Sequence, residues 1–315
     1  MTQYIVNRLL QAVPVFFIIG AVTFVLMRIP AGDPVTFLAA DNPDMTNQMI
    51  EALREDLGLE RPLIVQYLDW QLGVIRGDLG YSYLNSFPVA TLIGQRLPKS
   101  IELALFALAV GLPIALVSGI LAAVFRGSWI DNAVTAFVTA GISIPSFWLA
   151  IMLIIVFGVN LGWLPTTGYV PLFEDPVQHL KLITLPTITL AVLVAAPAMR
   201  FLRANLIEVL EQDYVRTARA KGLSENIVII RHALKNALIP TVTFIGVQSG
   251  HLLAGTVVIE FVFGWTGLGW FTVFAIQSSD FLIVQGTVLV YAALFMGINI
   301  AVDIIYAYLD PRIRY

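Results

Sequence analysis

The 315-residue sequence contains no cysteine and few charged residues. Without cysteine the chain has neither disulfide bonds nor a thiolate for catalysis or metal binding. Only 12% of the residues are Asp, Glu, Lys or Arg, whereas 58% are hydrophobic and the mean hydropathy is +0.84. A soluble domain of this length does not bury so large an apolar fraction in its core. The composition therefore predicts an integral membrane protein.

Several motifs of enzymes and carriers are also absent. The sequence has no Gly-x-x-x-x-Gly-Lys-Ser/Thr loop for ATP phosphates and no Gly-x-Ser-x-Gly elbow. The three histidines, His179, His232 and His251, form no His-x-x-x-His pair, so we expect no metal site. The uncharged runs lack the series of acidic or basic residues that an ion-coupled carrier places inside its bundle. We predict that the chain is not an enzyme.

Long uncharged runs predict the membrane spans, because a span needs about 20 mostly apolar residues. The runs are 9–27, 103–125, 132–173, 182–199, 236–259, 261–279 and 281–302. The run 261–279 is interrupted by three glycines, two tryptophans, one glutamine and two serines, and we expect it to be an interfacial loop. The other runs predict an all-α protein with six transmembrane helices.

The charge distribution predicts the orientation of these spans. Six spans place both termini on one side of the membrane, and eleven basic residues would lie there: Arg8, Arg126, seven between 200 and 235, Arg312 and Arg314. The two short loops of the opposite side hold only Lys181. Basic loops stay in the cytoplasm, so we expect both termini to be cytoplasmic. The net charge of −3 combines a basic side and an acidic side of the membrane, so it indicates no binding to nucleic acid.

The chain divides into three parts. Residues 1–29 form the N-terminus and first span, 30–100 a large outer loop, and 101–315 the remaining spans. Within the outer loop we expect a helix at 45–57, and a second helix after Pro62 that lies at the membrane interface. Pro98 and Ser100 are expected to lead into the second span. The loop is either a folded cap without a ligand role or a surface that receives substrate.

Small residues recur at every fourth position in the second and fifth spans and indicate close helix packing. They are Ala107, Gly111, Ala115, Gly119, Ala123, Gly246 and Gly250. These stripes can pack inside the bundle or against another subunit.

A second set of residues within the spans comprises candidates for a translocation pathway, because polar groups are costly in lipid and usually face a bundle interior. The candidates are Ser143, Ser146, Trp148, Thr187, Gln248, Ser249 and His251. The opposing interpretation is that the hydroxyl groups bond to their own helix backbone and that the histidine is a packing residue.

The segment Asp213–Gly222 is a short polar island between two spans. Asp213 suits an N-cap and Gly222 suits the left-handed residue just past a helix end. About two turns of helix lie between them, too few to be stable without packing against something. Its basic residues could equally form a plain solvated loop, as expected on the cytoplasmic side.

This segment, continued through Arg231-His-Ala-Leu-Lys-Asn-Ala237, resembles the cytoplasmic EAA loop of bacterial ABC-importer permeases, at about 208–236 here. Matches to the peptide and nickel importer subfamily run along nearly the whole chain. They are Gly32-Asp33-Pro34, Leu57-Gly58-Leu59 with Pro62, Gly77-Asp78-Leu79-Gly80, Leu164-Pro165, Trp265 with Gly267-Leu268-Gly269, and Asp310-Pro311-Arg312-Ile313-Arg314. The large outer loop resembles that of the subfamily's first permease.

Two motifs depart from the general importer loop. Arg216-Thr217-Ala218 stands where many permeases have Glu-Ala-Ala, and His232-Ala233-Leu234-Lys235 replaces Ile-x-Leu-Pro. Both are similar to the peptide subfamily. A glutamate-based contact of sugar permeases therefore does not carry over to this chain.

The resemblance implies a permease subunit in the bacterial inner membrane that imports short peptides or a similar small solute. The implied partners are a second permease, two ATPase subunits that hold ATP and Mg, an external substrate-binding protein, and membrane lipid. The implied ATPase-coupling residues are Asp213, Tyr214, Arg216, Thr217, Ala218, Arg219, Lys221 and Gly222. Within the family, import of nickel, glutathione or sugar is also open, and outside it a stand-alone secondary carrier or channel is the competing hypothesis.

Overall fold

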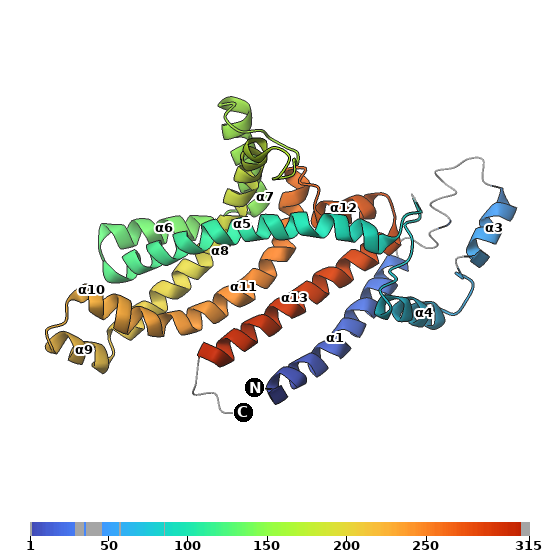
Figure 1. The fold of residues 1–315 in the computed structure, drawn as a ribbon. Coiled ribbons are helices and arrows are strands. Elements are labelled where there is room, and N and C mark those ends of the chain that lie inside the picture. The colour runs from blue at the N-terminus through green and yellow to red at the C-terminus, as the bar shows by residue number, and fades with distance from the viewer. Residues whose placement is uncertain (1, 29–34, 36–45, 57, 85, 310–315) are drawn as a thin grey trace.

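The computed structural model describes residues 2–28, 35, 46–56, 58–84 and 86–309, and this part of the chain is helical without strands. The helices are α1 (Thr2–Arg28), α3 (Asn47–Asp56), α4 (Leu63–Ile75), α5 (Val89–Val124), α6 (Trp129–Ser143), α7 (Ser146–Leu153), η1 (Ile154–Asn160), α8 (Pro176–Leu210), α9 (Asp213–Ala220), α10 (Glu225–Ile227), η2 (Val228–Leu234), α11 (Lys235–Val262), α12 (Leu268–Gln277) and α13 (Phe281–Leu309). Figure 1 shows α9 and α10 at one end of the long helices and α12 and α4 toward the other.

Five stretches of the described chain are long and apolar enough to cross a membrane. They are Leu10–Arg28, Val89–Val124, Pro176–Leu210, Glu225–Phe263 and Phe281–Ile305. A bent pair, Trp129–Ser143 with Ser146–Asn160, becomes a sixth span if it is counted as one. An all-helical membrane protein with five or six spans is thus confirmed.

The third predicted span is present as a bent pair of helices and not as one continuous helix, a bend that the prediction of six spans did not include. The chain bends by 103° between α6 and α7. Pro145 lacks an N–H and disfavours a helical conformation at the preceding residue, and Ile144 accordingly is extended, with ψ 123. A Cβ built on Gly141 would lie 3.0 Å from Val192, which is near the middle of α8. The break therefore lies beside the middle of α8, the most buried of the apolar spans, where Figure 1 shows α7 leaving the bundle.

The run 261–279 does not form a span of its own, as expected, but most of it is a helix and not a loop, because α12 occupies Leu268–Gln277. Two of the three glycines, Gly264 and Gly267, precede this helix, and Gly269 lies in its first turn. Gly264 has φ +60 just past the end of α11, and Gly267 is the N-cap of α12. With 10 residues and a length of about 15 Å, α12 is too short to span a bilayer.

The second span begins earlier than expected. α5 starts at Val89, after the N-cap residue Pro88, and Pro98 lies inside the helix. The Val89 N–H donates to the Gly80 carbonyl at 2.9 Å, which fixes the entry of the chain into α5. The two expected helices of the outer segment are present as α3 and α4, and α4 follows Pro62. The Gly32-Asp33-Pro34 and Asp310–Arg314 motifs lie outside the described residues.

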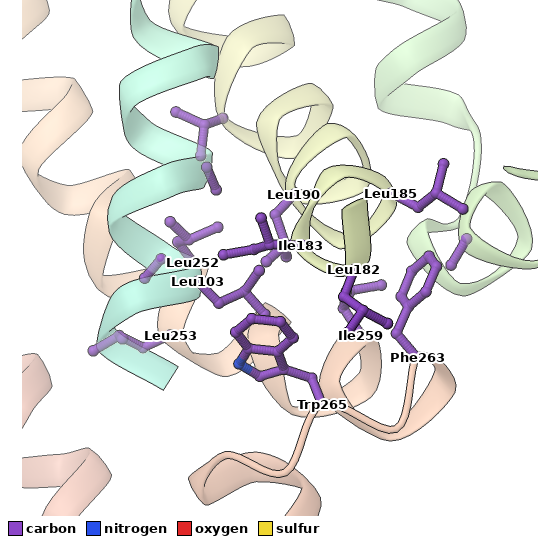
Figure 2. Close-up of a cluster of buried hydrophobic side chains, with 14 residues drawn as sticks. Leu103, Leu182, Ile183, Leu185, Leu190, Leu252, Leu253, Ile259, Phe263 and Trp265 are labelled. Carbon is purple, nitrogen blue, oxygen red and sulfur yellow. The ribbon is translucent and has the colours of Figure 1, made fainter. Parts of the chain in front are cut away.

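The largest hydrophobic cluster joins α5, α8 and α11 around Trp265 (Figure 2). Trp265 is fully buried, and its indole N–H donates to the Lys99 carbonyl at 2.9 Å. Its ring packs edge-on against Tyr169 and His179, with centroid distances of 4.7 Å and 5.6 Å. A buried tryptophan contributes a large apolar area, and its hydrogen-bonded N–H fixes the orientation of the ring. Trp265 therefore holds the turn before α12 in a defined position.

The small residues of α5 lie in its contact with α8. Ala107, Gly111, Ala115, Gly119 and Ala123 are all buried. A Cβ on Gly111 would lie 2.9 Å from the Ala191 carbonyl oxygen, and one on Gly119 would lie 3.2 Å from the Met199 carbonyl oxygen. The two backbones thus approach too closely for a larger residue. Gly246 and Gly250 of α11 lie against the side chains of Val302 and Phe295 of α13 and not against its backbone.

We predict that Gly111→Ala destabilises the protein, because the added methyl group meets backbone that has no room to move. Overpacking of this kind costs about 1–3 kcal/mol. Gly94 is the matched control on the same helix, since a Cβ there meets nothing within 4 Å. Gly94→Ala should leave stability unchanged or raise it by up to about 1 kcal/mol through helix propensity. Thermal unfolding in detergent measures both, and equal effects would contradict the close approach of α5 and α8.

Candidate functional site: the α9 segment and the polar groups of the bundle

The α9 segment connects α8 to α11 through α9, α10 and η2. It has a small core of its own, in which Val215, Ala218 and Val228 are buried and pack with Leu210 at the end of α8. A helix of 8 residues is unstable alone, so this apolar contact provides the packing that the short helix needs. The core ties α9 directly to the last turn of α8.

The ends of α9 differ in part from the prediction. Asp213 is not the N-cap: that position is taken by Gln212, whose side chain accepts no capping hydrogen bond, and Asp213 is the first helical residue. A carboxylate in the first turn still interacts favourably with the helix dipole. Gly222 has φ +80 just past the helix end, as its sequence position indicates. Its N–H donates to the Arg219 carbonyl at 2.9 Å, and the Leu223 N–H donates to the Ala218 carbonyl at 3.4 Å.

Two side-chain contacts hold α9 against the segment that follows it. The Arg219 guanidinium donates to the Glu225 carboxylate of α10, with the shortest distance 2.6 Å from Nη2 to Oε1. This hydrogen bond raises the pKa of Arg219. The Tyr214 hydroxyl accepts from the Asn236 amide at 2.8 Å, at the start of α11. Tyr214 and Arg219 are therefore partly engaged within the segment.

The outward face of α9 carries Asp213, Arg216, Thr217 and Ala220, all exposed, followed by exposed Lys221. These positions recur at helical spacing opposite the buried Val215 and Ala218. The Arg216 Nη1 to Asp213 Oδ1 distance is 3.3 Å, but both side chains are highly exposed, at 72% and 97%. A pair so open to solvent contributes little to folding, so both groups are accessible to a partner.

The expected pathway residues occupy three places: the break between α6 and α7, the helix α8, and the helix α11. Ser143 and Trp148 are exposed at the break between α6 and α7, and Ser146 is partly buried there. Thr187 is buried in α8, and its hydroxyl has no hydrogen-bond partner.

The others lie on α11. Gln248 and Ser249 are partly buried, and the Ser249 hydroxyl donates to the Ile245 carbonyl of its own helix at 2.9 Å. His251 is exposed, with its ring 5.9 Å from that of Phe295. A neighbouring cavity of about 840 Å³ is lined by Gly250, but Gln248, Ser249 and His251 do not line it.

Buried charged groups at the run boundaries were not among the predicted residues. Glu260 is fully buried at the end of α11, and its Oε2 accepts from the Gly269 and Trp270 N–H groups at 2.8 Å and 3.1 Å. It thereby caps α12. Asp131 is buried at the start of α6 and pairs with Arg203 of α8. Each acid is the single charge beside a long uncharged run, which is the pattern that could have identified it.

A membrane helix bundle with an exposed basic segment at one end suits a transport subunit that is driven from outside the bundle. Residues 115–315 match the family model described as "Binding-protein-dependent transport system inner membrane component", and residues 1–104 match the model of its N-terminal part. The chain belongs to this family. It is therefore a multi-pass inner membrane permease of a binding-protein-dependent ABC transport system, and it is not an enzyme.

Relatives of the permease match over its full length. A Brucella abortus (strain 2308) protein, named as a permease of a peptide transport system, is 43% identical over 100% of both chains. The Escherichia coli (strain K12) glutathione transport system permease protein GsiC is 40% identical, again over 100% of both. A solved structure, "Crystal structure of an amino acid ABC transporter with histidines", covers 71% of this chain and 94% of that one, with 13% identity and a TM-score of 0.48.

We predict that Gly222→Ala loosens the α9 segment, because the residue at φ +80 would place a Cβ in the left-handed region at a cost of about 1–2 kcal/mol. Space is not the limit, since a Cβ there meets nothing within 4 Å. Gly222→Asn is the matched control, because Asn tolerates this conformation better. Hydrogen exchange of residues 213–228 measures the loosening, which should be larger for alanine. Equal exchange in both variants would show that backbone conformation at Gly222 does not hold the segment.

Proposed function

We propose that this permease forms half of the translocation pathway of an ATP-driven importer of short peptides, and that α9 is its contact with an ATPase subunit. The observation that carries the proposal is the two-sided character of α9. One face packs on the end of α8 through Val215 and Ala218, and the other presents Arg216 and its neighbours to solvent. A displacement of α9 is thus transferred to a long helix of the bundle.

The proposed orientation follows the positive-inside rule. Both termini and the loop at about 208–236 lie in the cytoplasm, and residues 30–100 lie in the periplasm between the first span and the transmembrane part at 101–315. The contact of Arg8 with Asp303, 3.1 Å from Nε to Oδ2, supports the placing of both ends on one side. With this orientation the α9 segment faces the compartment that contains ATP.

The proposed partners are a second, homologous permease, two ATPase subunits with their ATP and Mg, and a periplasmic substrate-binding protein. The ATPase contact comprises the outward side chains of Asp213, Arg216, Thr217 and Lys221. Tyr214, Ala218, Arg219 and Gly222 act differently: their contacts within the segment support a role in holding α9 in position. The pathway is proposed to include the break residues Ser143, Ser146 and Trp148, with Thr187, Gln248, Ser249 and His251 on α8 and α11.

Peptides are the proposed substrate because the full-length relatives serve peptide and glutathione transport systems by name. Glutathione is itself a short peptide, so one class covers both. Import of nickel or sugar has no such support from these two relatives.

We predict that Arg216→Glu lowers ATP-dependent peptide uptake by about tenfold, the equivalent of about 1.4 kcal/mol of lost docking energy. The reason is reversal of charge on the exposed face of α9. The measurement is uptake of a radiolabelled dipeptide by liposomes that contain the permease pair, the ATPase subunits and the binding protein.

Arg61→Glu is the matched control for this variant. Arg61 is also exposed and paired with a nearby aspartate, Asp69, at 3.1 Å, but it lies just before α4, which is at the opposite end of the structure from α9 (Figure 1). Uptake should remain normal in this variant. Normal uptake in Arg216→Glu would contradict the ATPase contact, and uptake by the wild-type chain without ATPase subunits would indicate a stand-alone carrier instead.

A further inference from the structure

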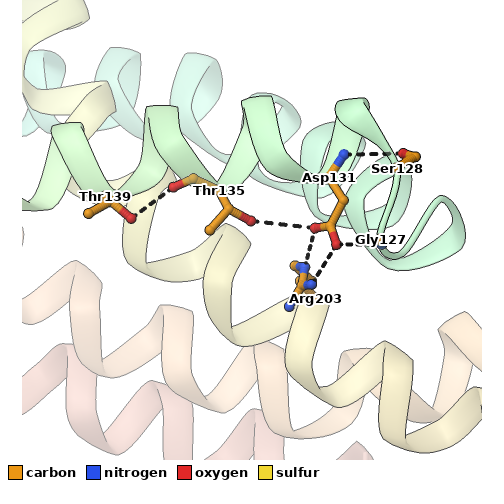
Figure 3. A network of polar contacts seen from close by, with 6 residues as sticks. All are labelled: Gly127, Ser128, Asp131, Thr135, Thr139 and Arg203. Atoms are coloured by element: carbon orange, nitrogen blue, oxygen red, sulfur yellow. Dashed lines mark hydrogen bonds and ion pairs between the residues drawn. The ribbon is translucent and has the colours of Figure 1, made fainter.

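An ion pair joins α6 to α8 near the α9 end of the bundle (Figure 3). The Arg203 Nε and Nη2 groups donate to the two carboxylate oxygens of Asp131 at 2.6 Å and 2.8 Å. The same carboxylate accepts from the Gly127 N–H at 2.9 Å and the Thr135 hydroxyl at 3.4 Å. Asp131 is buried, with a side-chain exposure of 5%. A bidentate pair fixes angle as well as distance, so α6 and α8 are held in one relative orientation.

The position of this pair along α8 lies between the α9 segment and the break between α6 and α7. Arg203 lies two turns before Leu210, the residue on which the α9 core packs. On the other side, α6 runs from Asp131 to Ser143 and ends at the break with α7. α6 is therefore tied to α8 at one end and ends at the exposed break residues at the other.

We propose that Asp131 and Arg203 are positioning residues that make α6 move with α8, so that a displacement of α9 reaches the break at residues 144–145. This inference rests on the proposed role of α9. Without the pair, α6 would retain its apolar contacts with α8, including that of Gly141 with Val192, but these contacts are non-directional and, among the residues that the structure describes, include no hydrogen bond that fixes the relative orientation of the two helices. The Asp131–Arg203 pair thus determines how much of a displacement of α9 is transmitted to the break at residues 144–145.

The test compares uptake with ATP hydrolysis in the reconstituted transporter, using a radiolabelled dipeptide. In Asp131→Asn and Arg203→Met, the number of peptides imported per ATP should fall about tenfold, within the usual range of coupling between two sites. The rate of ATP hydrolysis and the amount of assembled complex should stay close to wild type. Arg203→Lys keeps the charge but loses the planar bidentate geometry, and its ratio should lie between these variants and wild type.

Glu211→Gln is the matched control. Glu211 pairs with Arg126 at 2.6 Å, likewise between the start of the α6 region and the end of α8, but both side chains are exposed, at 65% and 59%. Its loss should leave the ratio of peptide to ATP unchanged. An equal fall in the number of peptides imported per ATP in Glu211→Gln would show that any charge change near α9 uncouples the transporter. That result would overturn the specific role of Asp131.

A covalent tie separates positioning from simple stabilisation. The chain has no cysteine, so Gly141→Cys with Val192→Cys introduces one defined cross-link between α6 and α8. In the Asp131→Asn background, oxidation of the two cysteines to a disulfide should restore the number of peptides imported per ATP. Reduction of that disulfide should lower the number again.

The proposal is wrong if cross-linking restores nothing, or if Arg203→Lys matches wild type. These outcomes stand apart from a failure of the proposed function, which would appear as an absence of ATP-dependent uptake in the wild-type complex.

Discussion

A polar group inside a membrane protein must find its partner within the protein, because lipid offers no hydrogen bonds. This constraint shapes both ends of the bundle. Near α12, the Glu260 carboxylate and the Ser100 hydroxyl accept from the first N–H groups of the helix, and Trp265 donates to the backbone of α5. Near α9, Asp131 satisfies Gly127 and Arg203. The apolar contacts between these ends fill space, while the polar contacts select one arrangement.

The long helices were predictable because length and hydropathy are local properties of a sequence, and α5, α8, α11 and α13 each contain one of the uncharged runs. The break at Pro145 was not predictable in the same way. Pro98, Pro113 and Pro186 lie inside continuous helices, whereas Pro145 ends one. Whether a proline is accommodated depends on the neighbours that satisfy the freed carbonyl, and those neighbours come from distant parts of the chain.

The same distinction applies to α9. Its limits follow from local residues, since Gly222 ends the helix wherever the segment packs. The roles of its side chains do not, because the partners of Ala218, Arg219 and Tyr214 are Val228, Glu225 and Asn236, which reach α9 only after the chain has turned back. Sequence alone therefore grouped residues that hold α9 with residues that face solvent. The structure separates the two sets by burial and contact.

The burial of α8 supports the proposal that a segment at one end of the bundle acts on the middle of it. In the most apolar stretch of α8, 72% of the residues are buried, compared with 6% for α13, and α5, α6, α7 and α11 all contact α8. Its contact with α5 is lined by alanine and glycine along the small-residue stripe and includes one polar contact, His179 Nε2 with Glu102 Oε1 at 3.5 Å, whereas its contact with α6 includes the bidentate pair of Asp131 with Arg203. Displacing α8 against α5 breaks no side-chain hydrogen bond of that stripe. Displacing it against α6 would break the bidentate pair of buried Asp131 with Arg203, which is why α6 is proposed to follow α8.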